Sequence, residues 1–326
     1  MRLITFHDGQ EARTGAWIDG DRQIIDLASA AAAQGRPTDA FASMQSLIES
    51  GARGLDLART LVEASPDNAI RPTSSVRLLS PVPRPIQMRD ALAFELHLRQ
   101  AKRASARMRL RNHPQAEEQL LALASSGALE IPPVWFRQPV YYKCNRFTVI
   151  GDGETVQWPA YSQMLDYELE LGIFIGKTGR DISAANAHEH IFGYTIYNDV
   201  SARDAQADEM ACMLGPAKGK DFDTGNIIGP CIVTADELTE PYALEMVARV
   251  NGIEWSRGNS STMHHRFEDI IAHVSASETL YAGEFIGSGT VGNGCGFELG
   301  RYPQAGDEIE LEIQGIGKLR NRFGTA

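Results

Sequence analysis

The stretch that decides the fold reads Asp166-Tyr167-Glu168-Leu169-Glu170-Leu171-Gly172-Ile173-Phe174-Ile175. Its second half is apolar at consecutive positions, which predicts a strand buried on both faces. In its first half three acidic residues alternate with other residues, so their carboxylates share one face of a strand. Such charges repel one another unless solvent or a hard divalent cation lies between them. The stretch therefore predicts either a wet strand face, like that of residues 308–312, or a metal site at the end of a buried strand.

The sequence around this stretch indicates an α+β, β-dominated chain with two parts. After residue 131 short strands alternate with Gly- and Pro-rich turns, among them the hairpin signal Asn251-Gly252, and a helix is predicted over 266–274. Residues 1–80 predict a small α/β domain, and the proline-rich segment 71–85 predicts a linker that marks its boundary. We therefore expect an N-terminal domain over 1–80 and a catalytic domain over 81–326.

Within the N-terminal domain, strands are expected over 3–6, 16–18 and 23–27, and Asp19-Gly20-Asp21 supplies a hairpin turn. A helical pattern follows over 44–64, where Gly51 and Gly54 favour two shorter helices.

Composition excludes some classes of partner. The 326 residues carry a formal net charge of −11, which argues against nucleic acid as a partner and leaves a small anionic substrate open. No apolar run approaches the ~20 residues of a membrane helix and no targeting segment is recognisable, so a cytoplasmic protein is expected. The cysteines at positions 144, 212, 231 and 295 lack the CxxC spacing and predict reduced thiols rather than a zinc site or disulfides.

Four other segments could carry chemistry, each with a plainer alternative. Asn198-Asp199 ends a predicted strand, where Asp199 could bind the same cation or cap a helix. Asp90 is followed by His97, a residue type suited to act as a general base but more often a core or surface residue. The loop 218–224, with Lys220, suits anion contact or is a solvated turn. Residues 287–290 are glycine-rich and let the backbone approach a ligand, but their GxGxxG lacks the βαβ context of a dinucleotide site.

The helix-like region 95–124 begins with a strongly basic segment. It is either a solvated helix face or a lid over an anionic substrate.

Taken in order, these segments resemble the fumarylacetoacetate hydrolase family over roughly residues 85–323. The strongest matches are Asp166-Tyr-Glu-Leu-Glu170, Tyr197-Asn-Asp-Val-Ser-Ala-Arg-Asp204, Gly219-Lys-Asp-Phe-Asp-Thr224 with Gly229-Pro230, and Gly315-Ile-Gly-Lys-Leu-Arg-Asn321. The resemblance implies a rolled mixed β-sheet, a homodimer or higher oligomer, and Mg²⁺ with Ca²⁺ or Mn²⁺ as substitutes.

The resemblance also implies roles for individual residues. The implied metal ligands are Glu168, Glu170 and Asp199, with Asp90 as a further carboxylate. The implied base is His97, oriented by Glu298. Residues implied to line the substrate pocket are Tyr142, Gln206, Lys220 and Thr290, of which Lys220 also takes part in catalysis.

Three departures from the family pattern bear on these roles. Ala91-Leu92 replaces an aromatic pair common after the Asp. Gln100 stands where the acylpyruvase branch carries a Glu three residues after its His, which argues against that branch's His–Glu pair. The loop between Thr290 and Glu298 is shorter than in animal fumarylacetoacetases, which puts the match of Glu298 in question.

We therefore expect a Mg²⁺-dependent hydrolase acting on a carbon–carbon bond of a small anionic β-diketone or acylpyruvate, of the kind met in aromatic catabolism. His97 would activate water and the metal would stabilise the enolate. Alternatives that use the same metal site are decarboxylation of an oxaloacetate-like acid and hydration or isomerisation of a dienoic acid. A ligand-binding protein without turnover is a further alternative. A cysteine nucleophile is disfavoured because no histidine lies near a cysteine in sequence.

Overall fold

A mixed sheet of twelve strands forms the framework of this computed structural model, which describes residues 1–325. The strand order is β4-β3-β2-β1-β15-β13-β11-β19-β6-β7, and β5 pairs with β1 while β8 pairs with β15. The strands of this sheet are β1 Arg2–His7, β2 Ala12–Ile18, β3 Gln23–Asp26, β4 Ile70–Pro72, β5 Arg77–Leu79, β6 Met88–Ala91, β7 Tyr141–Lys143, β8 Val149–Ile150, β11 Leu169–Ile175, β13 Ile191–Asp199, β15 Asn226–Thr234 and β19 Phe285–Gly287.

A second sheet of five strands, in the order β17-β16-β20-β21-β9, shares a core with the first. Its strands are β9 Thr155–Val156, β16 Glu245–Val250, β17 Ile253–Asn259, β20 Glu308–Ile313 and β21 Gly317–Phe323. Asn251 and Gly252 turn between β16 and β17 with positive φ, as the hairpin signal predicts. Two small ladders join β10 (Leu165–Asp166) to β14 (Ser201–Ala202) and β12 (Gly179–Arg180) to β18 (Thr279–Leu280).

Most pairs are antiparallel, but β8–β15, β6–β19 and β9–β21 are parallel. The expectation of an α+β fold with a rolled mixed sheet is therefore confirmed.

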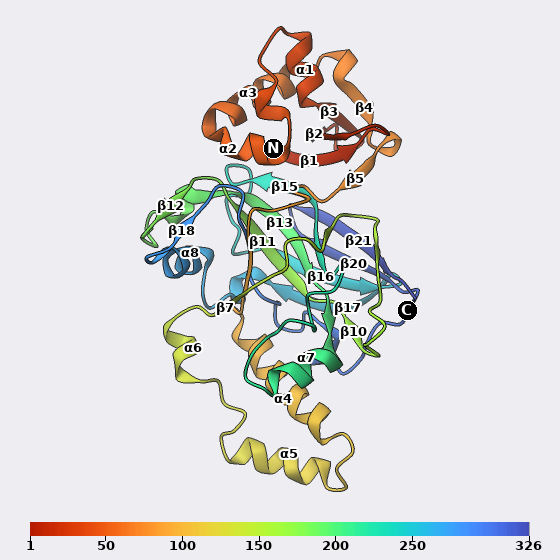
Figure 1. Cartoon of the computed structure of the whole chain (residues 1–326), viewed down its shortest axis with the longest axis vertical. Helices are drawn as coiled ribbons and strands as arrows, with labels where there is room; N and C mark the ends of the chain where they lie inside the picture. The colour runs from red at the N-terminus through yellow and green to blue at the C-terminus, as the bar shows by residue number, and fades with distance from the viewer. Residues whose placement is uncertain (326) are drawn as a thin grey trace.

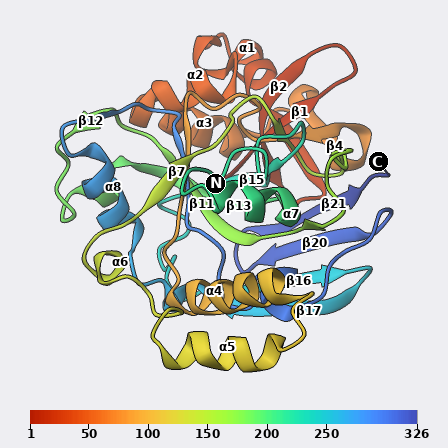
Figure 2. The same cartoon turned by 60° about the horizontal axis from the view of Figure 1, so that its bottom comes forward.

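The helices lie mainly at the two ends of the molecule (Figure 1). They are α1 Leu27–Ala33, α2 Met44–Glu49, α3 Gly51–Ala64, α4 Glu95–Leu110, α5 Ala116–Ser125, α6 Pro133–Arg137, α7 Arg203–Met210, α8 Phe267–Ser275 and α9 Gly296–Leu299. Figure 2 shows α4 and α5 side by side below the sheets. Among the described residues no helix is long and apolar enough to span a membrane.

The N-terminal part packs α1, α2 and α3 against strands β1–β4, at the top of Figure 1. The predicted helical stretch 44–64 is two helices, because Gly51 at φ 60° starts α3 in a backbone conformation that side chains disfavour. The proline-rich segment carries β4 and β5 rather than forming an open linker, and β1 pairs with β15 at Leu3 and Ile232. The sheet is thus continuous between the two parts, and the domain boundary at residue 80 stays a prediction.

In the large sheet the C-terminal ends of β6, β13 and β19 lie beside the first residues of β11, which brings distant residues together. Leu169 of β11 pairs with Asn198 of β13, and Gly172 of β11 pairs with Gly287 of β19. Gly287 in turn pairs with Asp90 at the end of β6. This register places the acidic residues of β6, β11 and β13 together at one end of these neighbouring strands.

Candidate metal centre and active site

Three acidic side chains converge where these strands end. Asp90, Glu170 and Asp199 each offer an oxygen, and these oxygens all lie within 4.8 Å of one another. All three residues are buried, with at most 5% of their surface exposed. Gly289 follows β19, and its backbone N–H donates to Asp90 Oδ1 (3.1 Å) and Glu170 Oε2 (3.0 Å). The cluster is therefore built by the sheet register and not by local sequence.

The carboxyl groups of the cluster raise one another's pKa values, although Lys220 pairs with Asp199. Burial and the neighbouring Asp199 raise the pKa of Asp90 to about 7. Burial and Asp90 raise the pKa of Glu170 well above its usual range. Asp199 Oδ1 is buried without a hydrogen-bond partner among the described residues. Oxygen donors with unsatisfied negative charge are what Mg²⁺ or Ca²⁺ takes from a protein, so the residues present fit a hard divalent cation.

Glu168 lies beside this cluster in a network of ion pairs. Lys220 Nζ donates to Glu168 Oε2 at 2.6 Å and to Asp199 Oδ2 at 2.5 Å. Arg203 lies 2.8 Å from Glu168 Oε1. Burial acts to raise the pKa of Glu168, but Lys220 and Arg203 outweigh it and the pKa falls well below its usual range. Glu168 is therefore ionised and within reach of the cluster, and its role as a ligand stays a prediction.

His97 faces Glu298 across a buried contact. The imidazole Nδ1 lies 3.2 Å from Glu298 Oε1, without the alignment of a full hydrogen bond. Burial lowers the pKa of His97, but Glu298 outweighs it and the pKa is raised. Gln100, one turn further along α4, bonds Asn293 instead of His97. The histidine's acidic partner therefore comes from α9, even though the loop before α9 is short.

Most of the predicted pocket residues contact the acidic cluster, and they come from different parts of the chain. Tyr142 donates to Asp199 Oδ2 at 2.7 Å. Thr290 donates to Glu170 Oε1 at 3.3 Å. Gln206 accepts from the guanidinium of Arg203 at 3.1 Å. Tyr142, Thr290 and Lys220 thus contact the cluster directly, whereas Gln206 contacts Arg203, and the roles of all four stay predictions.

Sequence reasoning missed two residues of this site. Arg203 is buried between Asp166 and Glu168, and its position in the segment 197–204 was the available signal. Cys295 was set aside because no histidine is near it in sequence, yet His97, Cys295 and Glu298 place one ligand atom each within 4.8 Å of one another. Only the fold brings α4 to the loop before α9.

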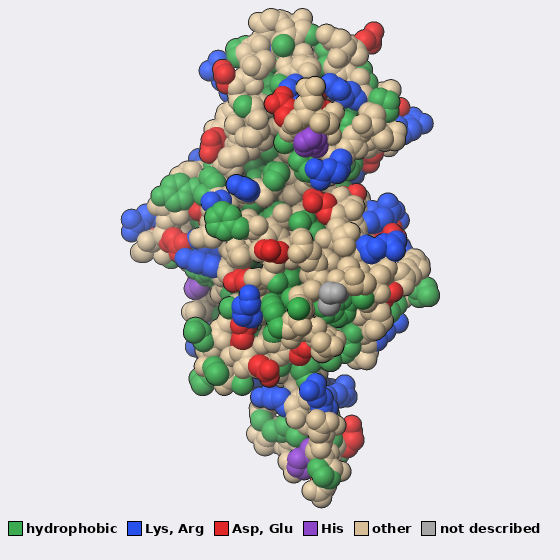
Figure 3. Space-filling view, turned by 45° about the vertical axis from the view of Figure 1, so that its right-hand side comes forward, with side chains coloured by type: hydrophobic (Ala, Val, Ile, Leu, Met, Phe, Trp, Pro, Cys, Tyr) green, Lys and Arg blue, Asp and Glu red, His purple; other side chains and the backbone are tan. Residues whose placement is uncertain are grey.

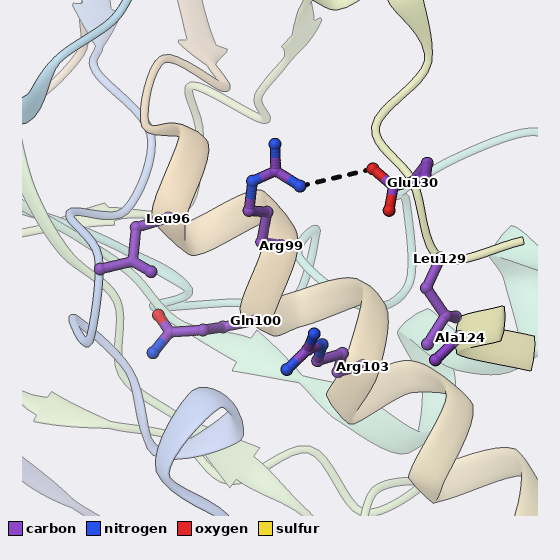
Figure 4. A pocket seen from close by; sticks show the side chains of 7 residues that line it. All are labelled: Leu96, Arg99, Gln100, Arg103, Ala124, Leu129 and Glu130. Atoms are coloured by element: carbon purple, nitrogen blue, oxygen red, sulfur yellow. Dashed lines mark ion pairs between the residues drawn. The ribbon is translucent and has the colours of Figure 1, made fainter. Parts of the chain in front are cut away.

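The basic helix borders the site on one side. In α4, His97 and Ala106 are buried, whereas α5 has no buried residue. A pocket of about 330 Å³ lies between α4 and the chain around α5, with Arg99 opposite Glu130 (Figure 4). Its lining residues are Leu96, Arg99, Gln100, Arg103, Ala124, Leu129 and Glu130. Figure 3 shows this end as a narrow projection from the body. Whether α4 and α5 act as a lid stays a prediction.

Comparison with known proteins shows the family to which the chain belongs. Residues 109–324 match the family model described as fumarylacetoacetate (FAA) hydrolase C-terminal. The chain belongs to the fumarylacetoacetate hydrolase family. A member from Pongo abelii, fumarylacetoacetate hydrolase domain-containing protein 2, is 31% identical over 281 residues, which are 86% of this chain and 79% of that one.

Other members carry a different activity in their names. Oxaloacetate tautomerase YisK of Bacillus subtilis is 36% identical over 62% of this chain and 65% of its own length. Human mitochondrial oxaloacetate tautomerase FAHD2A is 36% identical over 57% of this chain and 59% of its own length. The chain thus spans less than two thirds of the length of these two relatives.

Solved structures of the family share the whole fold. A fumarylacetoacetate hydrolase from Exiguobacterium antarcticum superposes with a TM-score of 0.73 at 28% identity, over 100% of both chains. Maleylpyruvate hydrolase from Sphingobium sp. SYK-6, in complex with manganese(II) and pyruvate, superposes with a TM-score of 0.71 at 24% identity, over 100% of both chains. The second likeness shows the fold alone.

Proposed function

We propose that this member of the fumarylacetoacetate hydrolase family hydrolyses a carbon–carbon bond in a small β-diketo acid or acylpyruvate, with Mg²⁺ as cofactor. The observation that carries the proposal is the buried His97–Glu298 contact beside the cluster of Asp90, Glu170 and Asp199. A hydrolase needs a base that activates water, and decarboxylation does not.

The cation would be held by Asp90, Glu170 and Asp199, with Glu168 beside them, and Ca²⁺ or Mn²⁺ could substitute. When bound, such a cation supplies a Lewis acid that polarises substrate oxygens and orients the substrate.

In this proposal His97 acts as the base. Because Nδ1 faces Glu298, the neutral imidazole would carry its proton on Nδ1 and leave Nε2 free to take a proton from water. The resulting hydroxide attacks the neighbouring carbonyl carbon, and the carbon–carbon bond breaks. Glu298 stabilises the imidazolium that forms. Catalytic contacts that are poorly aligned in the free enzyme commonly tighten when substrate binds.

Lys220 and Arg203 would stabilise the leaving fragment. Both are buried cations, and burial strengthens their interaction with a developing negative charge. Gln206 is held by Arg203 and can donate its amide N–H groups to the same oxygens. The leaving carbanion then takes a proton, and two acids result.

A second candidate is tautomerisation of an oxaloacetate-like 2-oxo acid. It is favoured by the names of the two relatives at 36% identity. This reaction uses the same acidic cluster and a proton-transfer residue but no attacking water.

The test is an assay of acylpyruvates, β-diketo acids and oxaloacetate with Mg²⁺, following loss of enol absorbance and identifying products. We expect two acid products from a diketo acid, ¹⁸O from labelled water in one of them, and no reaction with a chelator present. His97→Gln should lose about 10²–10⁴-fold in rate, the usual worth of a general base. Interconversion of keto and enol oxaloacetate without cleavage of any diketo acid would favour the tautomerase.

A further inference from the structure

A second group of metal-binding side chains lies next to the carboxylate cluster but differs from it in chemistry. His97 of α4, Cys295 and Glu298 of α9 offer a nitrogen, a sulfur and an oxygen within 4.8 Å of one another. Cys295 Sγ lies 3.4 Å from Glu298 Oε2, and His97 Nδ1 lies 3.2 Å from Glu298 Oε1. Cys295 has no exposed surface, and His97 keeps 6%.

We propose that His97, Cys295 and Glu298 form a separate site for a thiophilic divalent cation such as Zn²⁺, and that a cation bound there blocks the enzyme. The proposed inhibition rests on the proposed function, since it requires His97 to be the base. The proposed binding of the cation does not depend on any activity.

The donor set selects the metal. Thiolate and imidazole suit Zn²⁺, whereas Mg²⁺ and Ca²⁺ take oxygen ligands only. Zinc sites of three protein ligands leave a fourth position to water or substrate. With Zn–N near 2.0 Å and Zn–S near 2.3 Å, ligand atoms in a tetrahedron lie roughly 3.3–3.7 Å apart. Cys295 Sγ and His97 Nδ1 each lie at about this spacing from the Glu298 carboxylate, one from Oε2 and the other from Oε1.

Two independent features of the surroundings favour a cation. His97 Nδ1 is buried and has no hydrogen-bond partner among the residues described. The buried carboxyl groups around the site also outnumber the two buried cations, Arg203 and Lys220. Arg203 opposes a nearby metal charge, but Asp166 and Glu168 pair with it. The carboxyl groups in question are Asp90, Asp166, Glu168, Glu170, Asp199 and Glu298.

Binding needs little rearrangement of the chain. Backbone N–H groups of Asn293 and Cys295 already fix the Glu298 carboxylate at 3.2 and 3.1 Å. The Cys295 thiol loses its proton to solvent as the sulfur–metal bond forms. His97 binds the metal through Nδ1, so its single proton moves to Nε2, and no lone pair is left to accept a proton from water.

The binding test uses Co²⁺ in place of Zn²⁺, with saturating Mg²⁺ on the carboxylate cluster. Cobalt bound to a thiolate gives a charge-transfer band in the near ultraviolet. Cys295→Ser is the decisive variant, because serine is a preferred helix N-cap and can replace Cys295 at the start of α9. Cys231→Ser is the matched control, another buried cysteine that contacts Ile316 instead.

We expect the band at one equivalent of cobalt in the wild type and in Cys231→Ser, and its loss in Cys295→Ser. The affinity of Cys295→Ser for Co²⁺ should fall by more than roughly 10–100-fold, which is the loss expected when a residue that only orients a metal ligand is removed. A band of equal strength in Cys295→Ser, or no band in the wild type, overturns the site.

The activity test adds Zn²⁺ and compares each variant with its own zinc-free rate. Inhibition that excess Mg²⁺ does not reverse, and that Cys295→Ser abolishes, is the expected result. Inhibition that Mg²⁺ reverses and that persists in Cys295→Ser would place zinc on the carboxylate cluster and contradict the inference. If the enzyme proves inactive on every diketo acid, the cobalt band still decides the site.

Discussion

At the residue scale, Asp90 carries the charge that the proposed cation would neutralise. Its pKa is about 7 in the folded chain because of burial and Asp199, and about 3.9 in an unfolded chain. Between these values the folded state binds the proton more tightly, so the stability of the metal-free protein falls as the pH rises through this window. Under the proposed function Mg²⁺ binds the ionised form, so the stabilisation of the fold by Mg²⁺ should grow over the same pH range.

We predict that the rise in melting temperature on replacing chelator with Mg²⁺ is larger at about pH 8 than at about pH 5.5. The difference should shrink in Asp90→Asn, whereas Asp208→Asn, an exposed control, should leave it unchanged. An equal rise at both pH values in the wild type would remove Asp90 from the ligand set.

Glu298 raises the pKa of His97 against the effect of burial. Replacing it with Gln keeps the shape and removes the charge, so burial then dominates and the pKa of His97 falls. Because the base must be neutral, the acidic limb of kcat/KM should move to lower pH in Glu298→Gln. The rate on the plateau should fall by about 10–100-fold, as for loss of an orienting partner. An unmoved acidic limb would show that His97 is not the titrating base, and Glu308→Gln on β20 is the matched control.

Residue patterns alone favoured a cation near Glu168 and Glu170, whereas the roles of Asp90, His97 and Glu298 were implied only by the family resemblance. Carboxylates that alternate beside an apolar run, as Glu168 and Glu170 do, must meet solvent or a cation, and Leu171 to Ile175 make solvent improbable there. The meeting of His97 with Cys295 was not predictable. It depends on how α4 lies against α9, and no local pattern encodes that contact. Arg203 was hidden for the same reason, because its partner Asp166 is distant in sequence.

At the scale of the elements, α4 is fixed to the loop before α9 by one reciprocal pair. Gln100 Nε2 donates to Asn293 Oδ1 at 2.6 Å, and Asn293 N–H donates to Gln100 Oε1 at 3.2 Å. His97 lies three residues earlier on the same helix, so this pair holds the imidazole toward Glu298.

We predict that Gln100→Ala lowers kcat by about tenfold, the effect expected when a reacting group loses its alignment, and leaves Mg²⁺ affinity unchanged. Arg107→Ala, at an exposed position of α4, should leave kcat unchanged. Full retention of kcat in Gln100→Ala would show that other contacts position the helix. A loss of Mg²⁺ affinity would instead indicate that the carboxylate cluster had been disturbed.

Helix breaks and turns were predicted correctly where glycine or asparagine marked them in the sequence. The break between α2 and α3 and the turn at Asn251 follow from glycine and asparagine at positive φ. The segment over 71–85 differs from a linker because β5 pairs with β1 at Thr5, Phe6 and His7, an interaction between distant segments. Strands of two or three residues such as β10 and β14 are too short to carry any periodicity, so only tertiary pairing creates them.

At the scale of the whole molecule, the N-terminal part and the catalytic sheet share one core. Leu3 and Leu47 belong to the same buried cluster as Phe174, Tyr197 and Phe285. Tyr197 lies on the strand that ends at Asp199, and Phe285 lies on the strand that leads to Gly289. The N-terminal helices therefore brace the strands that present the acidic cluster.

A separate N-terminal domain and a shared core predict different unfolding behaviour. If β1 and the helices only assisted assembly, residues 1–80 would melt independently of 81–326. Because β1 covers the edge of β15 and the cluster is continuous, we predict a single calorimetric transition for the full chain. Leu47→Ala should lower the unfolding free energy by about 2–5 kcal/mol and keep the transition single. Two transitions, of which Leu47→Ala moves only one, would show that the boundary at residue 80 separates independent units.

In that case a chain of residues 81–326 should fold alone and bind Mg²⁺. A shared core predicts instead that removing β1 leaves an open, aggregation-prone strand edge on β15.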